Sequence, residues 1–235
     1  MRDWFSSVSE KPAPADYLVL LHGLGRTRRS FRWMAGELNR AGYHVLNVGY
    51  PSRSKPLSAL AADHIAPIIK SRCIDSNKRV HFVAHSMGCI VLREFLCSIL
   101  PSEDERSRVG RAVMIAPPNQ GSDIIDAIGS IPLVRAVLGP AAAELATHAQ
   151  SPIHTLGPIP IETGIIMGNK AAIPFFRGVL SGISDGIVTV ERGRLEGMRD
   201  FVVLPVDHTF AIRRRIVRDQ VLHFIETGLF NSLPA

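Results

Sequence analysis

Residues 80–88, with the sequence VHFVAHSMG, are the most informative part of the chain. A short apolar run rich in strand-forming residues ends abruptly at Ser86, and a helical pattern begins directly after it. Small residues, Ala84 and Gly88, flank Ser86 two positions away on each side. This pattern is typical of a nucleophile elbow, a strained strand-to-helix turn that exposes a serine hydroxyl above a sheet. Ala84 stands where the usual motif has glycine, and its methyl group makes the turn slightly more crowded. The stretch therefore predicts that Ser86 is a catalytic nucleophile.

Strand and helix patterns alternate along the rest of the chain. Strands are expected at 17–21, 43–48, 80–84, 112–116, 162–167 and 201–204. Helices are expected at 30–40, 57–70, 87–100 and 212–227, with Pro67 bending or interrupting the second of them. This alternation predicts an α/β fold, with a six-stranded, mostly parallel sheet covered by helices on both faces.

The length of 235 residues suits one domain that spans residues 1–235. Residues 1–16 are expected to form an irregular lead-in. Residues 117–161, rich in Pro, Gly and Ala, are expected to form a lid-like insertion of short helices between the fourth and fifth strands. In a parallel sheet, active sites lie at the carboxyl ends of the strands, so this insertion is expected to lie over the site.

A serine hydroxyl is a poor nucleophile at neutral pH, so it needs an adjacent base, which needs an orienting acid. His208 directly follows the last expected strand and precedes the final helix, which is the position expected of the base. The other histidines lie in turn motifs, begin strands or lack such a position: His22, His85, His44, His81, His64, His148, His154 and His223.

The acid is expected on a loop between the strands that carry the serine and the histidine. Asp185, in the sequence SDGIV at 184–188, has that position and gives the chain order Ser, Asp, His. Asp-Gly also favours a turn, and both roles are compatible. Asp207 is the competing candidate, although adjacent side chains on an extended loop tend to point apart. Asp123 and Asp126 in the insertion are more remote alternatives.

The tetrahedral intermediate of acyl transfer needs two fixed N–H donors. The amide of Met87, directly after the nucleophile, is expected to be one of them. The second is expected from HGLG at residues 22–25, after the first strand, where flanking glycines allow the Leu24 amide to turn inward. A simpler interpretation of His22-Gly23 is that it only ends the strand.

Three motifs, LHGLG at 21–25, AHSMG at 84–88 and SDGIV at 184–188, resemble those of the α/β-hydrolase superfamily. The similarity is greatest to small bacterial lipases and esterases with an Ala-His-Ser-Met-Gly elbow, and it extends over roughly 17–226. It implies an α/β-hydrolase fold and a serine hydrolase of carboxylic esters with Ser86, Asp185 and His208 as its triad. One departure is Cys89, where such lipases commonly have a second glycine. A larger side chain there would tighten the packing of helix on strand or narrow the pocket.

The expected substrate is a small-molecule or lipid ester with an apolar acyl chain. Apolar residues of the insertion either line the acyl site or form the buried face of its helices: Ile124, Ile125, Ile128, Ile131, Leu133, Val134, Val137 and Leu138. Thioesterases, amidases and acyltransferases would use the same residues. A non-catalytic binding module would be expected to show a broken triad or a blocked oxyanion loop. A haloalkane-processing enzyme would need a carboxylate in place of Ser86.

Composition excludes several other classes of protein. The net charge of +6 is modest, and no basic run is interleaved with aromatics, so nucleic-acid binding is not expected. The basic stretches 26–29 and 213–215 read as solvated surface or as weak peripheral contacts with anionic lipid. No cofactor is expected, because the glycines at 23 and 25 do not extend into a dinucleotide fingerprint, and the three cysteines lack metal-ligand spacing. Neither a signal peptide nor a membrane span is visible, so a cytoplasmic location is expected.

Overall fold

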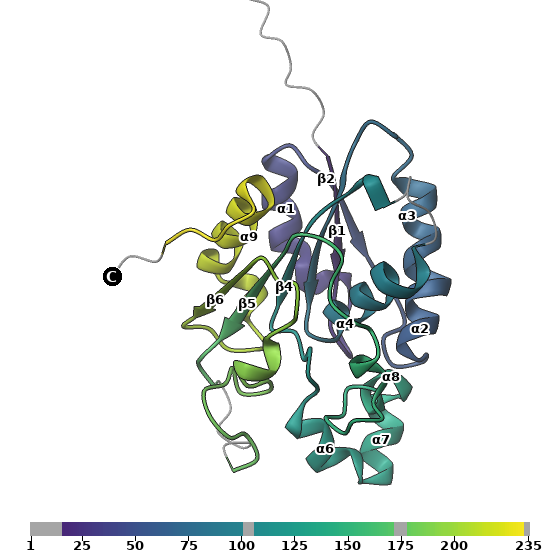
Figure 1. Ribbon diagram of the computed structural model, residues 1–235, viewed down its shortest axis with the longest axis vertical. Helices are drawn as coiled ribbons and strands as arrows, with labels where there is room; N and C mark the ends of the chain where they lie inside the picture. Colours follow the sequence, from purple (N-terminus) through teal and green to yellow (C-terminus); the bar gives the residue numbers. More distant parts are fainter. Residues whose placement is uncertain (1–15, 101–105, 172–177, 233–235) are drawn as a thin grey trace, which may run out of the picture.

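The computed structural model describes residues 16–100, 106–171 and 178–232. Within them, six strands form one sheet in the order β2-β1-β3-β4-β5-β6, and every neighbouring pair is parallel (Figure 1). The strands are β1 (Tyr17–Leu21), β2 (His44–Val48), β3 (Val80–His85), β4 (Val109–Ile115), β5 (Thr163–Gly168) and β6 (Asp200–Leu204). The predicted α/β architecture with six strands is confirmed. Of the predicted lead-in at 1–16, only Asp16 lies within the described residues.

Helices cover both faces of the sheet, as predicted. One face packs against α1 (Arg32–Arg40) and α9 (Arg215–Thr227), and the other against α2 (Leu57–Leu60), α3 (Ala66–Arg72) and α4 (Met87–Glu94) (Figure 1). Successive side chains of a strand point to opposite faces, so a strand buried on both faces is apolar throughout. In β1, Leu18 and Leu20 enter one core, and Val19 and Leu21 enter the other.

Several expected boundaries were wrong in detail. The second expected helix, 57–70, is divided by a π-helical turn at Ala61–Ile65, and Pro67 lies in the first turn of α3. Proline lacks an N–H group, so the wider turn directly before it is the expected interruption. The helix after the elbow likewise changes to a π-helical turn at Phe95–Ile99. The last helix begins at Arg215 and not at 212, because a 3₁₀ turn at Ala211–Arg213 precedes it and Arg214 is extended.

The fourth strand begins at Val109, three residues earlier than predicted, because a side chain completes its pairing with β3. The register between the two strands shifts between Val80 and Phe82. There the backbone N–H of Arg111 donates to Nδ1 of His81 at 2.9 Å. Gly110 leaves room for the imidazole, since a Cβ at that position would lie 2.5 Å from the ring.

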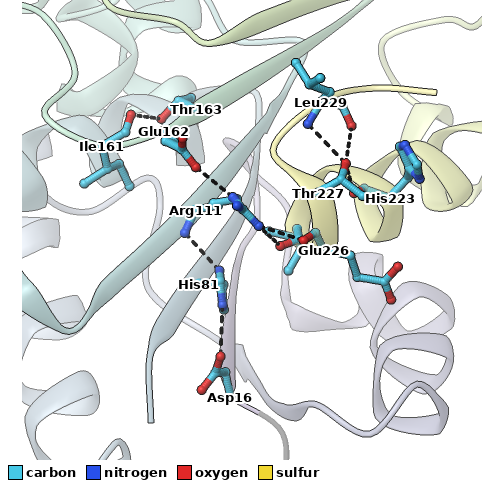
Figure 2. Close-up of polar contacts among 11 residues, drawn as sticks. Asp16, His81, Arg111, Ile161, Glu162, Thr163, His223, Glu226, Thr227 and Leu229 are labelled. Carbon is cyan, nitrogen blue, oxygen red and sulfur yellow. Dashed lines mark hydrogen bonds and ion pairs between the residues drawn. The ribbon is translucent and has the colours of Figure 1, made fainter. Parts of the chain in front are cut away.

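A polar network at the amino ends of the strands surrounds this histidine (Figure 2). His81 Nε2 lies 3.4 Å from a carboxylate oxygen of Asp16. The guanidinium of Arg111 donates to Glu162 at 2.8 Å and to the carbonyl oxygens of Ile225 and Glu226 at 2.8 and 2.9 Å. Those carbonyls belong to the last turn of α9, where carbonyl oxygens have no N–H partner within the helix, and Arg111 supplies the missing donors.

The insertion at 117–161 contains short helices: α6 (Asp123–Gly129), α7 (Pro132–Leu138), α8 (Pro140–Ala143) and a 3₁₀ turn at Pro152–His154. Arg93 of α4 forms hydrogen bonds with the backbone near both ends of this segment. Its guanidinium, which is buried, donates to the carbonyl oxygens of Asn119, Ile153 and Gly157 at 3.1–3.3 Å. Throughout the part of the chain that the structure describes, each helix is too short or too polar to cross a bilayer.

Candidate active site

Ser86 occupies a strained turn between β3 and α4. Its backbone has φ 54° and ψ −129°, in the positive-φ region that non-glycine residues rarely adopt. The turn needs a small residue at position 88, because a Cβ on Gly88 would lie 2.5 Å from the carbonyl oxygen of Leu21 and 2.6 Å from that of His22. The close packing at Gly88 therefore arises where α4 crosses the end of β1.

The structure brings together the three side chains that the sequence singled out. His208 Nε2 lies 2.9 Å from Ser86 Oγ, and His208 Nδ1 lies 2.8 Å from Oδ2 of Asp185. Asp185 and His208 are both buried, at 1% and 8% exposure. A neutral imidazole with its proton on Nδ1 donates to the carboxylate and leaves Nε2 free to accept the serine proton.

Backbone groups fix the Asp185 carboxylate. Its other oxygen, Oδ1, accepts hydrogen bonds from the N–H groups of Ile187 and Val188 at 2.9 and 2.8 Å. The N–H of His208 donates to the Asp185 carbonyl at 3.0 Å, which ties the two loops together. Gly168, at the end of β5, makes room for this arrangement, since a Cβ there would lie 2.8 Å from that of Asp185.

The alternative acids are engaged elsewhere. The carboxylate of Asp207 accepts the N–H of Phe210 at 2.9 Å and so caps its own turn. Asp123 forms a salt bridge of 2.6 Å with Arg192, and Asp126 bonds to Thr147. Among these carboxylates, Asp185 is the one that contacts His208.

The loop at residues 22–25 packs against the elbow and is held rigidly. A Cβ on Gly23 would lie 3.1 Å from that of Ser86. The ring of Tyr50 stacks on that of His22 with centroids 4.1 Å apart, and its hydroxyl donates to the His22 carbonyl. Ser52 Oγ accepts the N–H of Gly25 at 3.0 Å. Sequence reasoning missed Tyr50 and Ser52, because nothing in a linear pattern links them to a loop some 27 residues earlier.

Two amides next to Ser86 have no protein acceptor among the residues that the structure describes. Neither the N–H of Leu24 nor that of Met87 donates to another group in the described ranges 16–100, 106–171 and 178–232. Met87 is the first residue of α4, where an N–H has no partner within the helix. Leu24 lines the same cavity as Ser86.

His85 has a positioning contact that the sequence did not reveal. It is fully buried, and its Nε2 lies 2.9 Å from the carbonyl oxygen of His208, to which it donates. Burial, the largest cause, lowers the pKa of His85 to about 3, against the opposing effect of the nearby Asp185 carboxylate. His85 therefore stays neutral and holds the backbone of the His208 loop. The only signal in the sequence was its place directly before Ser86.

Cys89 is part of the packing and does not line the cavity. Its thiol is fully buried, 3.7 Å from the carbonyl oxygen of Ile115, and burial raises its pKa. Of the two effects considered from the sequence, helix-on-strand packing fits this position. A buried thiol with a raised pKa is chemically inert.

A cavity of about 250 Å³ opens at Ser86 and His208. Its apolar lining comes largely from the insertion: Ile124, Ile125, Ile128, Leu138 and Leu145. Other apolar residues of the insertion that were considered for the acyl site point elsewhere, since Ile131, Leu133 and Val137 are exposed. The first expectation therefore holds for the residues of α6 and for Leu138, which line the cavity, and neither expectation holds for the three exposed residues.

Comparisons with known proteins agree with this architecture. The sequence model of the alpha/beta hydrolase family matches residues 18–216. The mature form of the lipase BlEst2 from Bacillus licheniformis superposes with a TM-score of 0.71 at 21% identity, over 93% of this chain and 94% of that one. A metagenomic carboxyl esterase superposes with a TM-score of 0.67 at 19% identity, over 85% and 68%. An esterase from Pyrococcus furiosus gives 0.60 at 16% identity, over 90% and 82%. No curated protein sequence matches the chain.

Proposed function

This chain belongs to the alpha/beta hydrolase family, and we propose that it is a serine hydrolase that cleaves carboxylic esters through an acyl-enzyme on Ser86. One observation carries the proposal: Asp185, His208 and Ser86 are joined by hydrogen bonds of 2.8 and 2.9 Å at the mouth of a cavity. A nucleophile, a base and an orienting acid in this geometry are the requirements of acyl transfer.

In the first half of the reaction, Ser86 Oγ attacks the ester carbonyl carbon while Nε2 of His208 takes the hydroxyl proton. The Asp185 carboxylate, fixed by two backbone N–H groups, holds the ring and stabilises the imidazolium that forms. His208 then gives its proton to the leaving alcohol, which departs as the C–O bond breaks. Water attacks the acyl-enzyme in the second half, with His208 again as base, and releases the carboxylic acid.

The N–H groups of Leu24 and Met87 are proposed to bind the oxyanion. Both are free of protein acceptors in the described residues, and both lie beside Ser86. Donors fixed in advance need no reorganisation when charge develops on the oxygen, and each is typically worth about 3–4 kcal/mol of barrier lowering. The contacts of Tyr50 and Ser52 with the 22–25 loop supply this rigidity.

The cavity supports esters with a short apolar acyl chain. Aliphatic side chains dominate its lining, and its volume of about 250 Å³ lies below the ~300–1,000 Å³ typical of pockets for drug-sized ligands. We therefore expect butanoyl and hexanoyl esters to be hydrolysed with a higher kcat/KM than palmitoyl esters.

A panel of 4-nitrophenyl esters from acetate to palmitate tests the proposal, together with labelling by a fluorophosphonate. Wild-type protein should hydrolyse the shorter esters and label at one serine, and Ser86→Ala should lose both properties. A wild-type protein that neither labels nor hydrolyses any ester would refute the function. If thioesters or amides are cleaved faster than esters by the same serine, the reaction class is retained and the substrate is corrected.

A further inference from the structure

The basic stretch at residues 26–29 is adjacent to the proposed reaction centre. Arg26 lines the cavity that holds Ser86 and His208, and it is the one Arg, Lys, Asp or Glu side chain in the described lining of that cavity. It follows the 22–25 loop directly, and its backbone N–H donates to the carbonyl oxygen of Gly23. Its side chain is exposed and makes no hydrogen bond or salt bridge within the described residues. Arg26 therefore presents a free guanidinium to whatever occupies the cavity.

A second arginine lies over the same loop. The guanidinium of Arg53 covers Gly25, where an added Cβ would lie 2.6 Å from one of its terminal nitrogens. The Arg53 backbone packs closely against Gly139, at the junction of α7 and α8. A Cβ on Gly139 would clash with the Arg53 carbonyl oxygen. Like Arg26, Arg53 is exposed and has no acidic partner in the part of the chain that the structure describes.

Among the described residues, no carboxylate of the surrounding elements forms a salt bridge with Arg26 or Arg53. Asp123 pairs with Arg192, Asp126 with Thr147, and Asp63 with Lys55. Glu144 accepts the N–H of Leu57 at 2.7 Å. The cavity thus has an aliphatic lining from the insertion and an uncompensated positive lining from the 22–26 loop.

We infer that the preferred substrate is an ester whose alcohol side carries a phosphate or carboxylate, bound by Arg26 and Arg53. The inference rests on the proposed function for the ester bond itself. A guanidinium binds planar or tetrahedral oxyanions with two parallel hydrogen bonds. Arg26 in the cavity lining, with Arg53 over the adjacent Gly25, matches a dianionic phosphate better than a carboxylate. The apolar acyl chain then lies among the cavity-lining side chains of α6, Leu138 and Leu145, and the anion lies toward the 22–26 loop.

Three esters with one acyl chain test this assignment by titration of released acid. They are 2-hydroxyethyl hexanoate, 3-hexanoyloxypropanoate and 2-hexanoyloxyethyl phosphate, which differ in the charge of the alcohol. For wild-type protein, we expect kcat/KM to rise from the neutral to the carboxylate to the phosphate ester. The phosphate-to-neutral ratio should be about 10 to 100, the value of a charge-assisted hydrogen bond, and it should fall as salt is added.

Variants identify the groups responsible. Arg26→Gln should lower the phosphate-to-neutral ratio about tenfold, and Arg26→Gln with Arg53→Gln should bring it near one. Arg29→Gln is the matched control, because it removes an exposed arginine of the same stretch that does not line the cavity. A wild-type ratio of one or less, or a ratio unchanged by both variants, overturns the inference.

A binding experiment separates this inference from the proposed function. If the neutral ester is cleaved through Ser86 but the ratio is one, the inference fails and the function stands. If no ester is cleaved, the function fails, and calorimetric titration with hexyl phosphate decides the inference. Binding that weakens about tenfold in Arg26→Gln but not in Arg29→Gln supports an anion site. Absence of binding, or equal binding by both variants, overturns it.

Discussion

The two ends of the sheet each contain a histidine beside an aspartate, yet the surroundings of the two pairs differ. At the carboxyl ends of the strands, His208 lies between Asp185 and the hydroxyl of Ser86, next to a cavity. At the amino ends, His81 lies between Asp16 and the backbone N–H of Arg111 (Figure 2). The first aspartate is buried and 2.8 Å from its histidine, whereas the second is partly exposed and 3.4 Å away.

The contrast indicates what separates the proposed catalytic pair from a structural one. His81 uses its lone pair to accept an N–H that a strand carbonyl would otherwise accept, so no acceptor remains for chemistry. The His208 lone pair faces a hydroxyl on a residue with positive φ, in a place where a ligand has room. An Asp–His contact is thus weak evidence of catalysis unless the second imidazole nitrogen faces a nucleophile and a cavity.

The largest expected effect is the separation of activity from stability at the two histidines. His208→Ala should lower kcat/KM for 4-nitrophenyl butanoate by roughly 10⁴–10⁶-fold, because it removes the base, and should change the unfolding midpoint little. His81→Ala should do the opposite, with activity within a few-fold of wild type and a loss of about 1–3 kcal/mol of stability from the unpaired N–H. Steady-state kinetics and urea unfolding of both variants make the comparison. Equal losses of activity in the two variants would contradict the division of roles.

The next effect distinguishes the two aspartates near His208. Asp185→Asn should lower kcat about 10⁴-fold, because an amide stabilises the wrong tautomer of the imidazole. Asp207→Asn should leave kcat within a few-fold of wild type, because that carboxylate accepts the N–H of Phe210 and so caps its own turn. The measurement is single-turnover kinetics with the same ester. A large loss in Asp207→Asn alone would reassign the acid.

The sequence predicted the carboxyl end of the sheet far better than the amino end. Ser86 and His208 could be placed because each directly follows an apolar strand, and parallel strands bring their carboxyl ends together. Asp185 could be placed by its order between the other two. Each of these signals lies within a few residues of the chain or in the order of residues along it, so it can be recognised in the sequence alone.

The amino end depends on contacts between distant residues with no local signal. The bulge at His81 exists because Gly110, 29 positions away, leaves space for an imidazole, and therefore the fourth strand was predicted to begin too late. The contact of Arg111 with the carbonyls of α9 spans more than a hundred residues. The hydrogen bonds of Tyr50 and His85 at the site went unseen for the same reason.

An intermediate effect concerns pH, and it involves one buried histidine at each end of β3. Burial is the main cause that lowers the pKa of both His81 and His85, and a nearby carboxylate opposes it at each, Asp16 at His81 and Asp185 at His85. Below about pH 6.5 the unfolded chain binds protons that the folded chain excludes, so the free energy of unfolding should fall as the pH is lowered. The loss is at most about 1.4 kcal/mol per pH unit for each group, and for His85 it extends down to about pH 3.

Urea unfolding at pH 7.5, 5.5 and 4.5 measures this slope. Replacement of either histidine by asparagine should flatten the acid limb, and His85→Asn should flatten it more because its window is wider. The free energy of unfolding of each variant at pH 7.5 is the control, since it records the loss of stability caused by the substitution itself. An unchanged slope in His85→Asn would mean that this histidine is protonated in the folded protein.

The smallest expected effect tests whether the amino end is fixed by shape as well as by hydrogen bonds. Gly110→Ala places a methyl group 2.5 Å from the His81 ring, so it should cost about 1–3 kcal/mol through overpacking. In a His81→Ala background the obstacle is gone, and the same substitution should cost markedly less. Urea unfolding of wild type, the two single variants and the double variant gives the coupling energy between Gly110→Ala and His81→Ala. We expect this energy to be about 1–2 kcal/mol. Additive effects would show that the imidazole moves aside freely, and the bulge would then not depend on the fit between Gly110 and His81. Activity should persist throughout the cycle, because the Ser86 turn at the other end of β3 keeps its own contacts with β1 and β4.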